Sequence, residues 1–336
     1  MSEINHAVEN EVWERRLRVL ETCLGKSIMQ YMHDDNVTEV MVNPDGRLWL
    51  DTFEKGIVPT DVVMKPEDTK RIIYMVADIS GQVIDLKVDP SLQANIPESR
   101  LFSNCRFQAE LPPIVAAPSF NIRKHSKIVI TLDDYVRQGA MSEMQRQVIL
   151  DAIHGKKNII AAGGTGSGKT TLLNAILAEI STLGDRIVTI EDTKELKCTA
   201  ENYVALSTTD TVDMDNLLRK TLRLSPNRIV VGEVRGKEAL TLIDAWSTGH
   251  RGGCSTVHSD SAHDTLFRLE DLVSRVSISS QQAGIARAID VIVYIERRAV
   301  SRTIAEVLSI DGWDRERHDY TTHRLDAVQD DAVQEE

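Results

Sequence analysis

The chain has 336 residues, of which 42% are hydrophobic, and this length suggests about two domains of ordinary size. A formal net charge of −12 disfavours a protein that binds nucleic acid over a broad basic surface. The four cysteines form no CxxC pair, the amino terminus is polar and acidic, and no apolar run approaches the roughly 18 residues of a membrane span. These features predict a soluble intracellular protein.

The first third of the chain predicts a small α+β domain. Apolar residues recur at helical spacing between residues 10 and 32, with charged residues between them. Around Asp45-Gly46, apolar and polar side chains alternate on both sides of the turn, which is typical of a β-hairpin. The predicted elements are helices over 10–32 and 66–80, a hairpin over 39–51, and strands within 100–111 and 119–124.

A change of pattern after residue 140 predicts a second domain. Short apolar runs alternate there with helical stretches, which is typical of a largely parallel sheet covered by helices. The runs expected to be strands are 158–162, 186–190, 228–232 and 291–295. The predicted organisation is a domain over 1–124, a linker over 125–140, an α/β domain over 141–311 and an acidic, mobile tail over 312–336.

A glycine-rich segment in the second domain has the pattern of a phosphate-binding loop. Gly163 is followed after four residues by Gly168, Lys169 and Thr170, with a strand predicted before the loop and a helix after it. Glycines let the backbone N–H groups point inward at phosphate oxygens, and the helix start adds a positive dipole end. We expect Lys169 to reach the β- and γ-phosphates and Thr170 to bind Mg²⁺. The predicted nucleotide-binding residues are Gly163, Gly164, Thr165, Gly166, Ser167, Gly168, Lys169, Thr170 and Thr171.

Acidic residues end two of the predicted strands. Glu191 and Asp192 follow one strand, and Gly232-Glu233 follows another. In a parallel sheet the carboxyl ends of the strands face the ligand, so these acids are candidates for chemistry, although an acid can also simply end a strand. An NTPase needs a carboxylate near Mg²⁺ and one that orients or deprotonates the attacking water. We expect Glu233 to be this base, with Glu191 and Asp192 supporting the metal and the water.

The segment STGHRGGCSTVHSD, residues 247–260, carries a histidine or cysteine at every fourth position: His250, Cys254 and His258. Its glycines argue against a helix, because each costs a helix interior roughly 1 kcal/mol. The residues also lack the paired spacing usual for zinc, so a metal site is disfavoured here. A structural role for a buried His258 remains the plain alternative.

Four segments in this order, GGTGSGKTT, TIEDTKEL, PNRIVVGEVRG and STGHRGGCSTVHSD, give the chain its resemblance to the secretion ATPases. These are the hexameric motors of type IV secretion, type II secretion and type IV pili. The resemblance implies that the segments are the Walker A loop, the Asp box, a Walker B segment and the His box. It also implies a RecA-like P-loop domain with a smaller N-terminal domain, ATP and Mg²⁺ as ligands, and His258 near the γ-phosphate. The chain is most similar to the Trb-type conjugal-transfer ATPases, over about residues 30–310.

The resemblance extends to residues outside these motifs. It implies that Arg106 and Arg123 of the N-terminal domain contact the nucleotide, and that the His-box glycines pack tightly beside it. His250 is expected to face a neighbouring subunit, and Arg219 and Arg223 are either further phosphate contacts or surface residues.

The implied partners are copies of the chain in a hexameric ring and other secretion components at the cytoplasmic face of the inner membrane. Stable nucleic-acid binding is not expected. Three alternatives stay open at this point: a type II secretion or type IV pilus motor, a RecA-like nucleic-acid translocase, and a nucleotide-gated scaffold.

Overall fold

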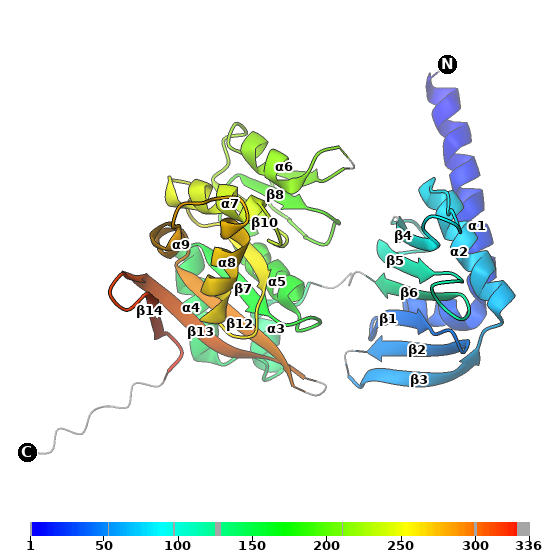
Figure 1. The fold of residues 1–336 in the computed structure, drawn as a ribbon, viewed down its shortest axis with the longest axis horizontal. Coiled ribbons are helices and arrows are strands. Elements are labelled where there is room, and N and C mark those ends of the chain that lie inside the picture. The colour runs from blue at the N-terminus through cyan, green and yellow to red at the C-terminus, as the bar shows by residue number, and fades with distance from the viewer. Residues whose placement is uncertain are drawn as a thin grey trace, which may run out of the picture. The chain divides into compact units, whose positions relative to one another are not determined.

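The computed structural model describes residues 2–52, 54–96, 98–124, 129–209, 211–298 and 301–327. The chain separates into two compact units, Met1–Ile128 and Val129–Glu336 (Figure 1). No helix within these described ranges is long and apolar enough to cross a membrane.

The described part of unit 1 contains a six-stranded antiparallel sheet with two helices on one of its faces (Figure 1). The strand order is β3-β2-β1-β6-β5-β4. The elements are α1 (Ser2–His33), β1 (Val37–Val42), β2 (Arg47–Thr52), β3 (Gly56–Val63), α2 (Pro66–Ser80), β4 (Ser91–Ile96), β5 (Cys105–Glu110) and β6 (Ser119–Lys124).

Apolar side chains at alternate positions of the unit 1 strands are buried and form its core. Val40 and Val42 of β1 are buried, as are Phe107 of β5 and Ile122 of β6, and they pack with the apolar stripes of α1 and α2. The predicted hairpin at Asp45-Gly46 and the predicted helices are confirmed. The sequence analysis missed β3 and β4.

Unit 2 is built on an eight-stranded sheet within the described residues, in the order β14-β13-β12-β7-β11-β10-β8-β9. The strands from β12 to β9 run parallel, while β13 and β14 are antiparallel at one edge. The strands are β7 (Ile159–Gly163), β8 (Ile187–Glu191), β9 (Tyr203–Ser207), β10 (Arg228–Val231), β11 (Cys254–His258), β12 (Val291–Arg298), β13 (Ser301–Asp314) and β14 (Asp319–Arg324).

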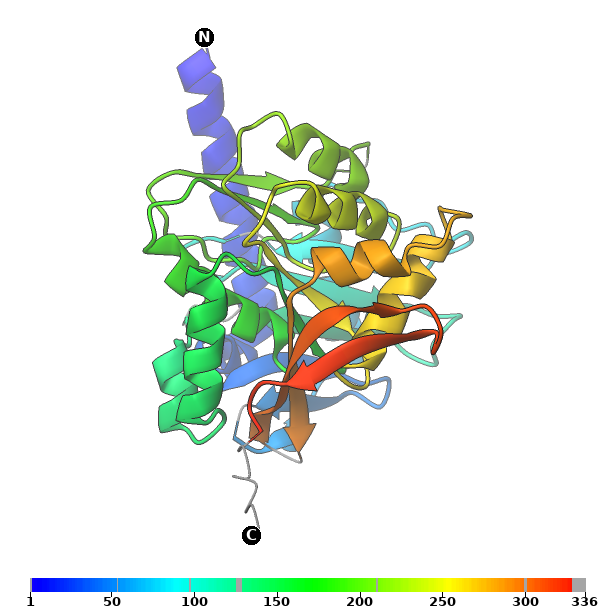
Figure 2. The same cartoon turned by 90° about the vertical axis from the view of Figure 1, so that its left-hand side faces the viewer.

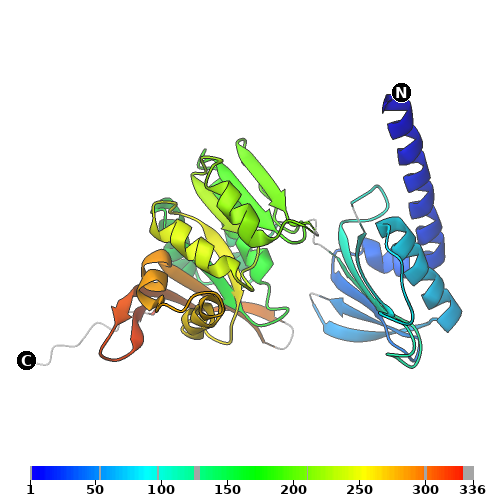
Figure 3. The same ribbon diagram turned by 45° about the horizontal axis from the view of Figure 1, so that its top comes forward.

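Helices cover both faces of this sheet, and a hydrophobic cluster fills the space on each side (Figures 2 and 3). One face carries α3 (Leu132–Arg137), α4 (Glu143–His154) and α5 (Lys169–Ser181). The other face carries α6 (Met214–Thr221), α7 (Glu238–Ser247), α8 (Asp264–Ser274) and α9 (Gln282–Ala288). The predicted α/β class with a largely parallel sheet is confirmed.

The linker predicted over 125–140 is wrong for its second part. Thr131 caps α3 in a reciprocal pair of hydrogen bonds with Asp134, and Tyr135 is buried in the core of unit 2. The backbone N–H of Ile304 on β13 donates to the carbonyl of Ala140 at 2.8 Å. This segment is therefore part of unit 2, whereas residues 125–128 lie outside the described residues.

The tail predicted from residue 312 is also wrong for its first part. β13 continues to Asp314, and β14 pairs with it antiparallel. Trp313 and Tyr320 face one another across these strands with ring centroids 4.8 Å apart, and Tyr320 is buried. Because acidic residues surround this aromatic pair in the sequence, the segment was predicted to be an acidic tail. The rest of the predicted tail, from residue 328, lies outside the described residues.

Candidate nucleotide site

The predicted phosphate loop connects β7, which ends at Gly163, to α5, which begins at Lys169. Gly166 and Gly168 have φ values of +70° and +99°, a conformation that side chains disfavour. A side chain at Gly163 would overlap with the carbonyl oxygen of Ile295 on β12. Ser167 Oγ is buried and has no hydrogen-bond partner among the described residues, which suits a loop that receives phosphate oxygens.

Lys169 folds back onto this loop and reaches the end of β11. Its side chain is largely buried, and its Nζ donates to the carbonyl of Gly164 at 2.8 Å. The same Nζ lies 3.2 Å from Nδ1 of His258. Because an ammonium group can only donate, Nδ1 is the acceptor, which assigns the proton of a neutral ring to Nε2.

His258 connects the phosphate loop to Glu233. Its Nε2 lies 3.0 Å from Oε1 of Glu233. The two atoms are close but not aligned as a hydrogen bond, since the buried Oε1 has no partner of hydrogen-bond geometry among the described residues. Lys169, His258 and Glu233 thus form one chain of contacts, which we call the Lys–His–Glu chain.

The sheet explains why three residues so far apart in sequence meet. β7, β11 and β10 are parallel neighbours, and His258 is the register partner of Gly163. All three strands therefore end at the same edge, where the sequence analysis expected its acids to gather. Glu233 follows β10 directly, after Gly232, whose N–H donates to Ile190 on β8 at 2.8 Å.

Glu233 is also held from the other side by the segment that leads into α7. Its Oε2 contacts the guanidinium of Arg235. Glu238 Oε1 accepts hydrogen bonds from the backbone N–H groups of Arg235 and Gly236, at 2.6 and 2.7 Å. Arg235 is a site residue that the sequence analysis did not single out, although it lies inside the quoted PNRIVVGEVRG segment.

Glu191 ends β8 and is almost fully buried, with 5% of its surface exposed. Its Oε1 accepts backbone hydrogen bonds from Glu195 at 2.7 Å and Leu196 at 2.8 Å. Burial raises the pKa of Glu191 to about 7, against the opposing effect of these two hydrogen bonds. One oxygen of the carboxylate therefore shapes the loop after β8.

The residues predicted to hold Mg²⁺ have suitable chemistry. Thr170 is the second residue of α5, and Asp192 is exposed and accepts a hydrogen bond from the Thr208 hydroxyl at 3.1 Å. A hydroxyl together with carboxylates at neighbouring strand ends suits an ion that keeps several waters. Because Oε1 of Glu191 already accepts two backbone hydrogen bonds, only its Oε2 is suited to such an ion.

The His-box glycines do not lie where the resemblance implied. Gly252 and Gly253 precede β11, at the end of the strand opposite the phosphate loop. A side chain at Gly253 would overlap with the carbonyl oxygen of Ile229 and the ring of Trp246. Their predicted packing beside a nucleotide is therefore wrong: Gly253 lies against the buried Trp246, and Gly252 lies against Arg228.

Two of the remaining predicted arginines lie on α6 or just after it. Arg219 contacts Asp215 one helical turn earlier at 3.0 Å, with its side chain exposed, as an ordinary surface salt bridge. Arg223 lies beyond Thr221, where α6 ends. His250 precedes β11, and its Nδ1 is buried without a hydrogen-bond partner among the described residues.

Arg106 and Arg123 lie in unit 1 and are direct partners across β5 and β6. Their neighbours Phe107 and Ile122 point into the core, so both arginines lie on the opposite face of the sheet. Arg123 Nε is 3.6 Å from Glu39 on β1. Their contact with a nucleotide stays a prediction.

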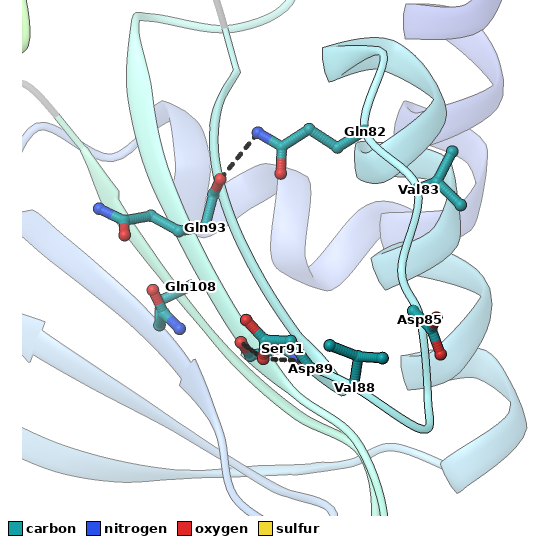
Figure 4. A pocket seen from close by; sticks show the side chains of 8 residues that line it. All are labelled: Gln82, Val83, Asp85, Val88, Asp89, Ser91, Gln93 and Gln108. Atoms are coloured by element: carbon teal, nitrogen blue, oxygen red, sulfur yellow. Dashed lines mark hydrogen bonds between the residues drawn. The ribbon is translucent and has the colours of Figure 1, made fainter. Parts of the chain in front are cut away.

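Unit 1 also has a shallow polar hollow between the loop after α2 and strands β4 and β5 (Figure 4). Gln82 donates to the carbonyl of Gln93 across it at 2.9 Å. It is lined by Gln82, Val83, Asp85, Val88, Asp89, Ser91, Gln93 and Gln108. None of the residues predicted to bind a nucleotide lines this hollow.

Comparison with known proteins identifies relatives over nearly the whole chain. Residues 24–321 match the family described as type II/IV secretion system protein. The conjugal transfer protein TrbB of Rhizobium radiobacter is 44% identical over 322 residues, which is 95% of this chain and 97% of the relative. A probable conjugal transfer protein TrbB of Sinorhizobium fredii is 42% identical over 313 residues, 93% of this chain and 94% of the relative.

Solved structures with the same fold include an ATPase and a pilus retraction motor. The ATPase DotB of Legionella pneumophila has a TM-score of 0.61 at 17% identity, over 89% of this chain and 79% of its own. The pilus retraction motor PilT, solved with bound ADP, has a TM-score of 0.60 at 19% identity, over 80% of this chain and 77% of its own. At these identities the likeness concerns the fold. The family match and the relatives confirm the resemblance that the four motifs indicated, and the chain belongs to the type II/IV secretion system protein family.

Proposed function

We propose that this protein hydrolyses ATP as the motor of a conjugative type IV secretion system and works as a ring of six subunits. The observation that carries the proposal is the Lys–His–Glu chain at the mouth of the phosphate loop. It joins the group expected to bind phosphate to the group expected to activate water. The names of the TrbB relatives support the conjugative role.

The side chains divide the chemistry among them. The loop N–H groups and Lys169 bind the phosphates, with the Lys169 ammonium exchanging the Gly164 carbonyl for a phosphate oxygen. Glu233 orients the attacking water and accepts its proton. His258 lies between Lys169 and Glu233, so it can make the position of Glu233 depend on whether the phosphate site is filled.

A bound Mg²⁺ would neutralise charge on the phosphates. Thr170 would hold it directly, and Glu191 and Asp192 through water. Arg235 positions Glu233 through the other carboxylate oxygen. We expect ATP hydrolysis to act mechanically through the ring. The ring would dock on other secretion components at the cytoplasmic face of the inner membrane.

The test compares phosphate release and nucleotide binding in two variants. We expect Glu233→Gln to bind ATP like the wild type while losing nearly all turnover, because the amide cannot accept the proton. Lys169→Ala should lose both, because it removes the ammonium that binds phosphate. Wild-type turnover in Glu233→Gln would contradict the assignment of the base. A wild-type rate no higher than that of Lys169→Ala would contradict hydrolysis as the function.

A further inference from the structure

The β12–β13 hairpin passes directly beside the phosphate loop and carries arginines there. Arg302 Nε on β13 donates to the carbonyl of Gly166 at 3.2 Å. Its Cδ would lie 3.0 Å from a Cβ added at Gly168, so its side chain lies along the loop. Arg297 on β12 is close as well, with Nη1 3.4 Å from the position of a Cβ at Gly166. Neither arginine belongs to a motif that the sequence analysis singled out.

The two arginines face one another. Arg297 and Arg302 are direct register partners in the antiparallel pair of β12 and β13, so their side chains project from the same face. On this face Arg297 is next to Ile295, and Arg302 is next to Ile304. Both isoleucines are buried in the core against α4 and α5. On each strand a half-buried arginine therefore lies next to a buried isoleucine, at the point where the hairpin reaches the phosphate loop.

The two guanidinium groups bring positive charge to the side of the phosphate loop. The adjoining phosphate loop is built to receive an anion. Two guanidinium groups beside such a loop can bind phosphate oxygens with paired hydrogen bonds, which a lysine cannot match.

The hairpin is held in place beside the loop. Ile304, two residues after Arg302, donates its N–H to Ala140 and accepts a hydrogen bond from Gln145 Nε2 at 3.2 Å. Burial raises the pKa of the Tyr135 hydroxyl, and the positive charge of Arg302 acts in the opposite direction. The guanidinium of Arg302 is therefore presented by the packed core of unit 2.

We propose that Arg297 and Arg302 form a second phosphate-binding element, which contacts the phosphates shared by ATP and ADP. The Lys–His–Glu chain meets the loop at Gly164 and Lys169, whereas the arginines meet it at Gly166 and Gly168. The arginines therefore contact the phosphates that ATP and ADP share, and the Lys–His–Glu chain contacts the γ-phosphate. This inference rests on the proposed function, since it requires a nucleotide in the loop.

The experiment measures the affinity of the full chain for ADP and for a non-hydrolysable ATP analogue by calorimetry. We expect Arg302→Ala and Arg297→Ala each to lower the affinity for both nucleotides by a similar factor of about tenfold, which corresponds to the loss of a charge-assisted hydrogen bond. In steady-state hydrolysis KM should rise more than kcat falls. Arg302→Lys should recover only part of the affinity, because it keeps the charge without the fork.

Arg298→Ala is the matched control. Arg298 is on the same strand and carries the same charge, but it is exposed, pairs with Glu296 and projects from the opposite face. Its removal should leave both affinities unchanged. Thermal unfolding of each variant without nucleotide identifies any that fails to fold, and Arg297→Gln is the second variant at the less constrained position.

Three results would overturn the inference. Unchanged affinities in folded Arg297 and Arg302 variants would make the pair structural. A much larger loss for the ATP analogue than for ADP would assign the pair to the γ-phosphate. An equal loss in Arg298→Ala would reduce the effect to general surface charge. If the wild type binds neither nucleotide, the proposed function fails together with the inference; if it binds and hydrolyses ATP normally, only the inference is at stake.

Discussion

Glu191 and Glu233 both follow strands of one parallel sheet, yet their surroundings give them different properties. Glu191 is buried and gives one oxygen to two backbone N–H groups, whereas Glu233 contacts a histidine and an arginine. The first arrangement raises the pKa of Glu191 to about 7 because burial outweighs the hydrogen bonds. Burial is thus the cause of the raised pKa of Glu191.

The raised pKa of Glu191 makes the stability of unit 2 depend on pH. Below about pH 4.5 the group is protonated in both the folded and the unfolded chain, and its contribution is fully present. As pH rises towards 7, the unfolded chain releases this proton first, so the free energy of unfolding falls. The loss approaches about 3.5 kcal/mol above pH 7, at about 1.4 kcal/mol for each pKa unit.

Glu191→Gln should remove this dependence, because the amide accepts hydrogen bonds and does not ionise. We expect the difference in thermal midpoint between variant and wild type to shift in favour of the variant between pH 5 and pH 8. The measurement is differential scanning calorimetry of nucleotide-free protein at several pH values. A difference that stays constant over this range would contradict the assignment.

At the scale of elements, the antiparallel edge of β13 and β14 completes a sheet that is otherwise parallel. Asp326, just after β14, accepts hydrogen bonds from Gln145 Nε2 on α4 at 2.6 Å and from the Val307 N–H at 3.2 Å. Together with buried Tyr320, these contacts attach the end of the described chain to the core. β13 also carries Arg302, so this edge supports one side of the phosphate loop.

A chain that ends at residue 311 should therefore be less stable than the full chain. It loses β14 and the Trp313–Tyr320 pair, and removal of a buried aromatic side chain alone costs about 3 kcal/mol or more. We expect a lower thermal midpoint together with weaker nucleotide binding.

The control is a chain that ends at residue 327, which retains every contact described for this edge. Its midpoint should match that of the full chain. Equal midpoints for the chain ending at 311 and the full chain would show that β14 contributes nothing to the fold.

At the scale of the whole molecule, two units on one chain suit a machine that changes shape. Closure of domains around a ligand is a standard switching motion, and repeating a head-to-tail contact about an axis closes a ring. Arg106 and Arg123, paired across β5 and β6, are the unit 1 residues that we expect to take part.

The proposed ring predicts that ATP hydrolysis per subunit depends on protein concentration. We expect the rate per subunit to climb and then to saturate as dilute subunits assemble, with Lys169→Ala as the inactive reference. Sedimentation at the same concentrations should report the mass of the assembly. A saturated rate at monomer mass would contradict the ring.

The phosphate loop, the strand-ending acids and the His box could be recognised in the sequence because each depends on local spacing. A glycine pattern between a strand and a helix leaves the backbone few other conformations, so Gly163 to Thr170 were placed correctly. The carboxyl-end rule for parallel strands then predicted that Glu233 would lie near this loop, and the resemblance to the secretion ATPases implied the same for His258. These inferences needed no knowledge of which strands are neighbours.

Residues that meet through pairing and packing could not be predicted in this way. Arg302 reaches Gly166 across more than 130 positions because of the register of β12 and β13, and no local pattern encodes that register. The same holds for β14, whose Tyr320 meets Trp313 only across the hairpin, and for Gly253 of the His box, which packs on Trp246. The sequence by itself determined the chemistry of the loop, since local backbone sterics decide it. Tertiary structure alone decided which distant charges surround that loop, because strand register and side-chain packing bring them there.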